Sequence, residues 1–433
     1  MASQLETFKT ESREQRYNFR SYNINGWGAN NDYPQRVLEV VENSVTGRAC
    51  VETYTKFIAG RGFAEESFYS AIINDRGDNV DTLLRQCAKD FAMFGGFAIH
   101  VNYNALGEVV SATHVPIEWL RSELLDGSFD YRRVALHPDW GHRAEHLRRF
   151  VKSDIDFFNL FDPSIDTIAQ EVEFAEGWEN YNCQIFLYSN NGPKTYPTPI
   201  YKAALVDMYI EQGLSNITLR NTRSNFLPAG FFIDKDHEAV DEHQAELKKR
   251  EFAAFQTDEN ACKIFYTNVL NGEDAPEFKP IKSNNYDKDF ENAENKTPQI
   301  IGRAFTQPPI LRAEDVGNNF GADAMGNAYD FYNSITETER QEIATAFERI
   351  FSLWHDKTIN PEGNYEILPK EYRVTRSLAE KLGENTESVI AILDDTTKTD
   401  AVKAVLLNKL YGIEDADIND LLAAYGSQPT PTE

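Results

Sequence analysis

The stretch Ile300-Ile-Gly-Arg-Ala-Phe-Thr-Gln-Pro-Pro-Ile-Leu311 organises this chain, because one helical pattern ends in it and another begins soon after it. The first pattern runs from Asp287 to Phe305. Pro308-Pro309 ends it, since proline cannot continue a helix beyond its first turn. Pro298 lies inside the pattern, so we expect the helix to kink there or to restart with Thr297 as its N-cap.

The sequence after this stretch predicts a loop and then a long helix. Residues 313–321 are rich in Gly and Asn, which is typical of a loop. From Asp323 to about His355, apolar residues recur at helical spacing and predict one long helix. Residues 375–425 have the pattern of short helices with polar faces, and residues 426–433 have the composition of a disordered tail.

The sequence before this stretch predicts a second long helix and a small mixed insertion. Pro199 suits the first turn of a helix, so one helix is expected from Ile200 to about Asn225, roughly 40 Å long. The insertion should contain a strand at 226–233, a charged helix at 236–255 and a strand at 263–267. Two long helices joined in this way cannot bury all their sides, and a ring of copies would supply the missing neighbours.

The first 200 residues predict a mixed α/β region. Residues 1–33 read as a polar arm that contains the loop-forming stretch Asn25-Gly-Trp-Gly-Ala-Asn-Asn-Asp32. Helices are expected from Pro34, from Cys50 to Gly60 and at 81–95, and strands at 97–103, 109–115 and 182–188. The pattern of residues 122–180 predicts no clear element.

The overall charge limits what the protein can bind. The chain has 433 residues and a formal net charge of −26, from 69 acidic and 43 basic side chains. Affinity for nucleic acid comes mainly from Lys and Arg that neutralise phosphates, so a protein that grips DNA is disfavoured. A protein that lets DNA slide past remains compatible with this charge. The 41% of apolar and 12% of aromatic residues indicate a folded chain.

The cysteines and the apolar segments indicate the compartment. The four cysteines, Cys50, Cys87, Cys183 and Cys262, form no C-x-x-C pair and are interpreted as buried thiols in a reducing compartment. The polar N-terminus has no apolar core of a secretory signal, and no stretch reaches the ~18 apolar residues of a membrane span.

Catalytic and metal-binding motifs are weak in this sequence. We find no G-x-S-x-G, no P-loop, no H-E-x-x-H and no G-x-G-x-x-G motif. His137, His142 and His146 are spaced as metal ligands could be, but their neighbours are Arg143, Arg148 and Arg149, so surface histidines are preferred. Residues 414–420 start like a calcium loop but lack its glycine and final Glu. We expect neither a metal nor another cofactor.

The basic cluster from Arg143 to Lys152 is the one feature that could contact nucleic acid. It has little aromatic interleaving. A solvated face, or a salt-bridge surface between subunits, is therefore the preferred interpretation.

Several segments resemble, in order, parts of the portal proteins of tailed bacteriophages. Residues 300–311 resemble the portal signature Ile-Ala-x-x-Phe-x-x-Pro-Pro-x-Leu, with Phe305, Pro308 and Pro309 at its motif positions. Residues 200–232 resemble the portal helix that runs into a Pro–small–Gly–apolar strand. Residues 43–63 and 83–116 resemble the first portal helix and the helix–Gly–hairpin of the wing. The chain departs from the pattern at Gly302, where Ala is common, and at Pro298, inside a helix usually continuous.

The resemblance implies an α+β, mainly helical portal fold with an α/β wing, a two-helix stem, a small α/β clip, a long wing helix and a helical C-terminal crown. The implied parts are an arm (1–33), the first part of the wing (34–199), stem helix 1 (200–225), the clip (226–283), stem helix 2 (284–309), the tunnel loop (310–323), the long wing helix (324–369), the crown (370–425) and the disordered tail (426–433).

The resemblance also implies a function. Copies of the subunit, usually twelve, would form a homo-oligomeric ring at one capsid vertex of the virion after synthesis in the host bacterial cytoplasm. Double-stranded DNA would pass through the ring during packaging and ejection. The clip would bind the large terminase and later the head–tail adaptor, and the ring would contact the major capsid protein, without a membrane or catalysis.

The resemblance further implies which residues line the channel. These would be Arg312, Glu314, Asp315, Asn318 and Asn319 in the tunnel loop, and Asp287, Asp289, Glu291 and Glu294 in the second stem helix. Carboxylates repeated round a ring would make the lumen negative, so that it repels phosphates and DNA passes without sticking. We expect residues 312–319 to form the narrowest part of the channel.

Two other functions remain open from the sequence. One is a soluble acidic hydrolase with an unrecognised carboxylate site, because nothing among the 69 acids singles out or excludes a catalytic pair. The other is a different ring-forming virion protein, such as a head–tail adaptor, although adaptors are usually much shorter. A particle of several hundred kilodaltons in solution would favour the portal over the hydrolase.

Overall fold

The structure is a computed structural model, and it describes most of the chain. The described residues are 16–19, 22–124, 133–141, 154–192, 196–223, 230–233, 277–280, 286–312, 322–372, 388–395, 398–411, 413, 418–419 and 421–422. The chain folds as two units, Met1–Glu371 and Tyr372–Glu433.

Three helices near the N-terminus form where apolar spacing predicted them. They are α1 (Tyr33–Asn43), α2 (Val45–Ala59) and α4 (Val80–Phe94), and α1 and α4 both pack against α2. Side chains cap two of these helices: Ser44 accepts a hydrogen bond from the Gly47 amide at 2.9 Å, and Asn79 accepts one from the Thr82 amide at 2.8 Å. The sequence predictions for this region are confirmed.

Six strands form one sheet in the order β4-β3-β8-β7-β6-β5. Their bounds are β3 Gly96–Tyr103, β4 Val109–Val115, β5 Leu120–Ser122, β6 Arg133–Leu136, β7 Asp156–Leu160 and β8 Gln184–Ser189. The β3–β4 hairpin and β8 confirm the predicted strands. Strands β5 to β7 and helix α6 (Ile165–Phe174) lie where the sequence predicted no element. Among the described strands, only β7 and β8 pair in parallel, and α6 lies between them in the chain.

Other parts of the same chain cover both edges of this sheet. At the β4 edge, the Val109 amide donates to Leu353 O at 2.9 Å, and the His355 amide donates to Val109 O at 3.0 Å. At the β5 edge, Ile24 bridges to Glu123. Because open strand edges invite pairing with other chains, these contacts protect part of each edge.

Part of the Asn/Gly-rich stretch near the N-terminus is a strand, so the prediction of a loop there is wrong for residues 25–27. Strand β2 (Ile24–Trp27) is buried and pairs with β1 (Arg16–Phe19). Trp27 stacks on Tyr196 with ring centroids 4.6 Å apart, and the Arg121 guanidinium lies 5.8 Å from the Trp27 ring. Burial of this large ring outweighs the loop preference of its neighbours.

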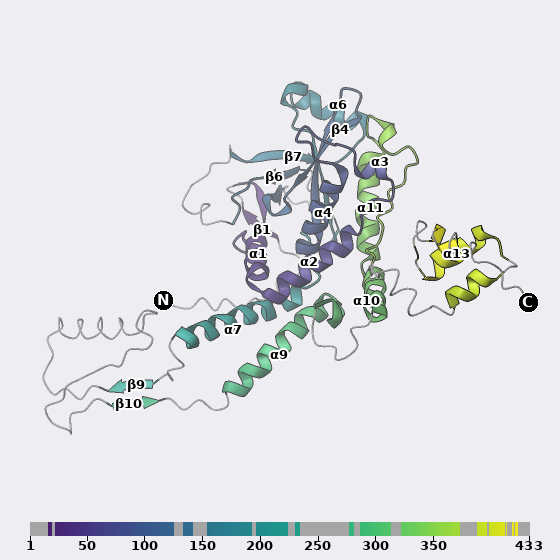
Figure 1. The fold of residues 1–433 in the computed structure, drawn as a ribbon. Helices are drawn as coiled ribbons and strands as arrows, with labels where there is room; N and C mark the ends of the chain where they lie inside the picture. Colours follow the sequence, from purple (N-terminus) through teal and green to yellow (C-terminus); the bar gives the residue numbers. More distant parts are fainter. Residues whose placement is uncertain are drawn as a thin grey trace, which may run out of the picture. The chain divides into compact units, whose positions relative to one another are not determined.

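The core of the first unit joins the sheet to helices on its face (Figure 1). Helix α11 (Glu337–Phe351) packs against α2 and α4. Aromatic rings link α11 to the segment that follows α2. The ring centroids of Phe63 and Phe68 lie 4.8 Å apart, and the ring centroid of Phe347 lies 5.1 Å from that of Phe63. These contacts hold a segment near residue 350 against one near residue 60.

Helices α7 (Leu205–Arg223) and α9 (Tyr286–Ala304) pack against each other, and α7 also packs on α1 while α9 packs on α2 (Figure 1). The predicted start of α7 at Ile200 is wrong, because residues 202–204 form a 3-10 turn before it. Strands β9 (Gly230–Ile233) and β10 (Glu277–Pro280) pair antiparallel between the two helices in the chain. The predicted helix at 236–255 and strand at 263–267 lie outside the described residues.

The predicted single helix from Asp323 to His355 is two helices, α10 (Ala322–Ile335) and α11, which meet at Thr336. Arg340 folds back over this break. Its guanidinium donates to Asn333 O at 2.6 Å, to the Thr336 hydroxyl at 2.7 Å and to Phe57 O at 3.2 Å. The buried arginine thus binds a carbonyl that the end of α10 leaves open, and burial lowers the pKa of Arg340.

The second unit has a small core of its own, made of Val389, Leu393, Leu407, Ile413 and Ile418. Its described elements are a helical segment at 388–394 and α13 (Asp400–Tyr411). The prediction of polar-faced helices is wrong for α13, which exposes Val402, Val405 and Leu410.

Short helical turns complete the described chain. They are α3 (Glu66–Tyr69) and the 3-10 turns η1 (Ile117–Trp119), η3 (Trp178–Asn180), η4 (Lys202–Ala204), η7 (Pro309–Arg312) and η8 (Lys357–Ile359).

Candidate functional site: the α7–α9 pair and the turn after Phe305

Helix α9 runs through Pro298 without interruption, so the predicted restart of the helix at Thr297 is wrong. Proline removes one backbone hydrogen bond and crowds the preceding turn, at a cost of about 3 kcal/mol. Packing of α9 along α7 and α2 offsets this cost. Thr297 is only 4% exposed and belongs to the buried side of the helix.

The chain leaves α9 in a tight turn at the Phe-Thr-Gln-Pro-Pro motif. The Thr306 amide donates to Arg303 O at 3.0 Å, and the Gln307 amide donates to Gly302 O at 3.1 Å. Thr306 has a φ of +52°, a left-handed conformation that is unfavourable for a β-branched residue. Such strain persists only where the surroundings enforce it, and this instance lies within the motif that the sequence singled out.

Phe305 fixes this turn to the rest of the molecule. Its side chain is fully buried and stacks on Tyr201, with ring centroids 4.7 Å apart. Tyr54 of α2 meets the same ring edge-on at 6.0 Å, and Tyr332 of α10 donates its hydroxyl to Phe305 O at 3.2 Å. Burial raises the pKa of Tyr201 and Tyr332, so both phenols stay neutral. One residue of the motif therefore joins elements far apart in the sequence.

Arg312 lies against the end of α9. Its guanidinium donates to Gln307 O at 2.6 Å. A β-carbon at Gly302 would overlap Arg312 Nη1, so the guanidinium fills the place of the missing side chain. An alanine at this position, as in the portal pattern, would force the Arg312 guanidinium to move, and Arg312, predicted to line a channel, is half-buried here.

The structure places only some of the other predicted channel residues. Glu291 and Glu294 are exposed on α9, three residues apart and hence on one face. Asp287 and Asp289 belong to α9, but their side chains are outside the described part. Glu314, Asp315, Asn318 and Asn319 lie outside the described residues. Pro308 is half-buried, and Pro309 is exposed.

Helix α7 is fixed to the N-terminus of α2 through Glu211. Its carboxylate accepts hydrogen bonds from the Ser44 hydroxyl and from the Thr46 hydroxyl, the latter at 2.7 Å, and lies 3.3 Å from the Thr46 amide. A negative group at a helix N-terminus is favourable because the free amides and the helix dipole attract it. At the same crossing, a β-carbon on Gly47 would lie 2.8 Å from Met208 Sδ, so a side chain at this position would force the Met208 side chain to shift.

Replacing Glu211 by Ala should lower the free energy of unfolding by about 1–2 kcal/mol, because the substitution removes the acceptor for two hydroxyls at the start of α2. Urea unfolding followed by circular dichroism measures the change. Glu42→Ala, at an exposed position of α1, is the matched control and should leave stability nearly unchanged. Equal midpoints for the two variants would contradict the role given to Glu211.

The outer face of α7 is apolar. Val206, Tyr209, Ile210, Ile217 and Leu219 are each 40–49% exposed. Val206, Ile210 and Ile217 follow helical spacing along one face. Large apolar side chains grouped on the outside of a helix are typical of a surface that meets another chain.

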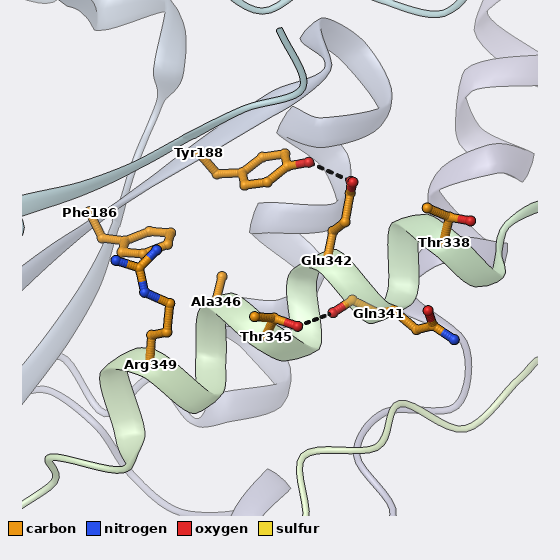
Figure 2. Close-up of a pocket in the computed structure, with 8 residues that line it drawn as sticks. All are labelled: Phe186, Tyr188, Thr338, Gln341, Glu342, Thr345, Ala346 and Arg349. Carbon is orange, nitrogen blue, oxygen red and sulfur yellow. Dashed lines mark hydrogen bonds between the residues drawn. The ribbon is translucent and has the colours of Figure 1, made fainter. Parts of the chain in front are cut away.

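A groove of about 320 Å³ lies between β8 and α11 (Figure 2). The Tyr188 hydroxyl donates to Glu342 at 2.5 Å, and the Arg349 guanidinium lies 5.3 Å from the Phe186 ring centroid. Gln341, Thr345 and Ala346 are also part of the described lining. The charged groups Glu342 and Arg349 of the groove are thus already engaged within the chain.

The prediction of surface histidines is wrong for His137. This residue is buried, and its Nδ1 accepts a hydrogen bond from the Asp139 amide at 3.1 Å. His142 and His146 lie outside the described residues. In the part of the chain that the structure describes, no three His, Cys, Asp or Glu side chains are grouped as metal ligands. None of the described helices is both long and apolar enough to cross a bilayer.

Sequence comparison finds no relative: no family model and no curated protein matches the chain. Solved structures do match. A chain of "Neck of empty GTA particle computed with C6 symmetry" is 15% identical, with a TM-score of 0.45 over 87% of this chain and 93% of that one. A chain of "Neck of native GTA particle computed with C12 symmetry" is 14% identical, with a TM-score of 0.42 over 86% and 93%.

A third match is an HK97 family phage portal protein from Corynebacterium diphtheriae. It is 10% identical to this chain, with a TM-score of 0.38, and the match covers 75% of this chain and 91% of that one. A portal protein is thus among the solved structures to which the chain is similar.

Proposed function

We propose that this chain is the subunit of a phage portal, a ring of about twelve copies at one capsid vertex of the virion. Double-stranded DNA passes through the ring during packaging and ejection. The role is structural and not enzymatic. The segment 226–283 binds the large terminase and later the head–tail adaptor, and the outside of the ring contacts the major capsid protein.

One observation carries this proposal: the α7–α9 pair exposes apolar side chains on α7 and acidic side chains on α9. The apolar face, with Val206, Ile210 and Ile217, needs a partner to exclude water. The acidic face, with Glu291 and Glu294, suits a surface that must not hold phosphates. A ring gives both faces a role, because each α7 can pack against the neighbouring copy while each α9 turns toward the lumen.

The order of elements supports the same proposal. A helix, an antiparallel strand pair, a second helix, the Phe305 turn and two further helices follow one another as the portal resemblance implies. The Phe305 contacts join the helix pair rigidly to α2 and α10, as a channel wall under the load of moving DNA requires.

Reversing the charge of the acidic α9 face should impair DNA passage. In a Glu291→Lys/Glu294→Lys variant the lumen would attract phosphates, and we expect the DNA content per particle to fall several-fold in a packaging assay. The control is Asn292→Lys/Gln299→Lys, which adds two lysines at exposed positions on another face of the same helix, although its total charge change is half as large. Equal packaging by both variants would contradict a lumenal position for Glu291 and Glu294.

A further inference from the structure

Helix α6 and the turn after it form an acidic and apolar surface. The sequence around them has charge of one sign only, since no Lys, Arg or His occurs between Lys152 and Lys194. The same interval contains eight carboxylates, at positions 154, 156, 162, 166, 171, 173, 176 and 179. Negative charge is therefore concentrated in the part of the chain that contains α6.

Large apolar side chains lie exposed among these acids. Ile165 is 68% exposed, Phe174 is 86% exposed and Trp178 is 42% exposed. Leu106, in the turn between β3 and β4, is 74% exposed, and Gly107 beside it would place a β-carbon 3.4 Å from Ile165. Figure 1 shows α6 next to this end of β4. Acidic and apolar groups thus alternate along α6 and the turn after it, with Phe174 and Trp178 exposed among Glu173, Glu176 and Glu179. We name this stretch, together with Leu106 at its start, the α6 surface (Leu106, Ile165–Phe174 and 176–179).

Part of the charge on the α6 surface is available to a partner. Glu171 accepts hydrogen bonds from Tyr181 at 2.6 Å and from Gln184 at 2.8 Å, so it is engaged in the fold. Glu173, Glu176 and Glu179 are exposed instead, and none of them forms an ion pair with another described residue. A partner that fits must be basic and must carry apolar side chains.

The chain itself contains a segment of this chemistry, between Gly141 and Asp154. It includes Arg143, Arg148, Arg149 and Lys152, and also Leu147, Phe150 and Val151. In the chain this segment precedes β7, whereas α6 follows β7. Between this segment and α6 the chain passes through β7, whose five residues span about 16 Å.

We propose that the α6 surface binds the basic segment 143–152 of a neighbouring copy. A ring needs a head-to-tail interface made of two different, complementary patches on each copy, and these two patches are complementary in both charge and apolar character. The inference rests on the ring of the proposed function. It adds a second contact between subunits, at the sheet, distinct from the apolar face of α7.

Charge reversal on each side tests the contact. Variant A is Glu173→Lys/Glu176→Lys/Glu179→Lys, and variant B is Arg143→Glu/Arg148→Glu/Arg149→Glu. At about 0.15 M salt, where exposed charges are screened beyond ~8 Å, each variant alone should form rings with an affinity lower by about tenfold or more. Mass photometry counts rings and free subunits. The control, Glu66→Lys/Glu348→Lys/Glu362→Lys, makes the same charge change at exposed positions elsewhere and should assemble normally.

Mixing the two variants is the decisive step. In an alternating ring, the basic surface of A meets the acidic segment of B, and the native surface of B meets the native segment of A. An equimolar mixture of A and B should therefore assemble like the wild type. A further chain, the A+B double variant, carries both sets of substitutions. If this chain assembles but the mixture of A and B does not, the ion pairs form within one chain and the proposal is wrong.

Other outcomes are equally clear. If A alone and B alone each assemble as the wild type does, the α6 surface has no such partner and the proposal is wrong. The proposal is also wrong if A alone fails to assemble and the addition of B does not restore assembly. Circular dichroism confirms that each variant folds. If the wild type itself forms no ring, the proposed function is wrong. If the wild type forms a ring and both variants also form rings, only the contact proposed for the α6 surface is wrong.

Discussion

Replacing Phe305 by Ala should lower the free energy of unfolding by about 3–5 kcal/mol, because it removes a fully buried ring and leaves a cavity. The cavity would lie between Tyr201 and Tyr54, which pack on two faces of the ring. The turn after α9 would lose its anchor to α2. We therefore also expect the variant to assemble poorly, even where it still folds.

Urea unfolding and mass photometry measure the two effects of Phe305→Ala. Phe331→Ala is the matched control, because the same side chain is 50% exposed on α10 and its loss should cost less than about 1 kcal/mol. Similar stabilities for the two variants would show that the Phe305 turn does not hold α9 to the rest of the molecule.

Replacing Gly60 by Val should abolish folding of the first unit. Gly60 has a φ of +57°, and a β-carbon there would overlap Leu368 O. The obstacle is backbone, which cannot move aside: Arg61 donates its amide to the same Leu368 O at 2.9 Å, and the Leu368 amide donates to Gly62 O at 2.9 Å. These bonds hold the segment after α11 against the end of α2.

We expect the Gly60→Val chain to be insoluble on expression or to unfold with a loss of more than about 4 kcal/mol. Gly77→Ala separates the two causes, since Gly77 also has a positive φ (+83°) but open space around it. The control should lower the free energy of unfolding by only about 1–2 kcal/mol, which is the cost of a left-handed conformation for a residue with a β-carbon. A soluble Gly60→Val chain with the stability of the control would contradict the close approach.

The sequence predicted the elements whose apolar spacing is regular. Helices α1, α2 and α4 and the β3–β4 hairpin form where 3.6-residue and two-residue periods indicated them. The short strands β5, β6 and β7 were not predicted, because each has five residues or fewer and is stabilised by its neighbours in the sheet. The break at Thr336 was missed for a similar reason: Arg340 satisfies the broken helix end from within the next helix.

The sequence predicted the motif of the candidate site but not the contacts that its residues make. The Phe-Thr-Gln-Pro-Pro signature marked Phe305, which the structure buries between Tyr54 and Tyr201. No sequence signal pairs Phe305 with residues more than 100 positions away, and none pairs Glu211 with Ser44. Such contacts depend on how the helices pack, which local patterns do not contain. The channel role of Glu291 and Glu294 stays a proposal.

The mass and shape of the purified chain in solution test the portal ring most directly. Mass photometry and negative-stain electron microscopy, with and without the co-expressed major capsid protein, give both. We expect particles of about 590 kDa, as twelve chains of 49.4 kDa require, and class averages with a central hole. A persistent species of 49.4 kDa under all salt conditions, with no ring in the images even beside the capsid protein, would contradict the portal assignment.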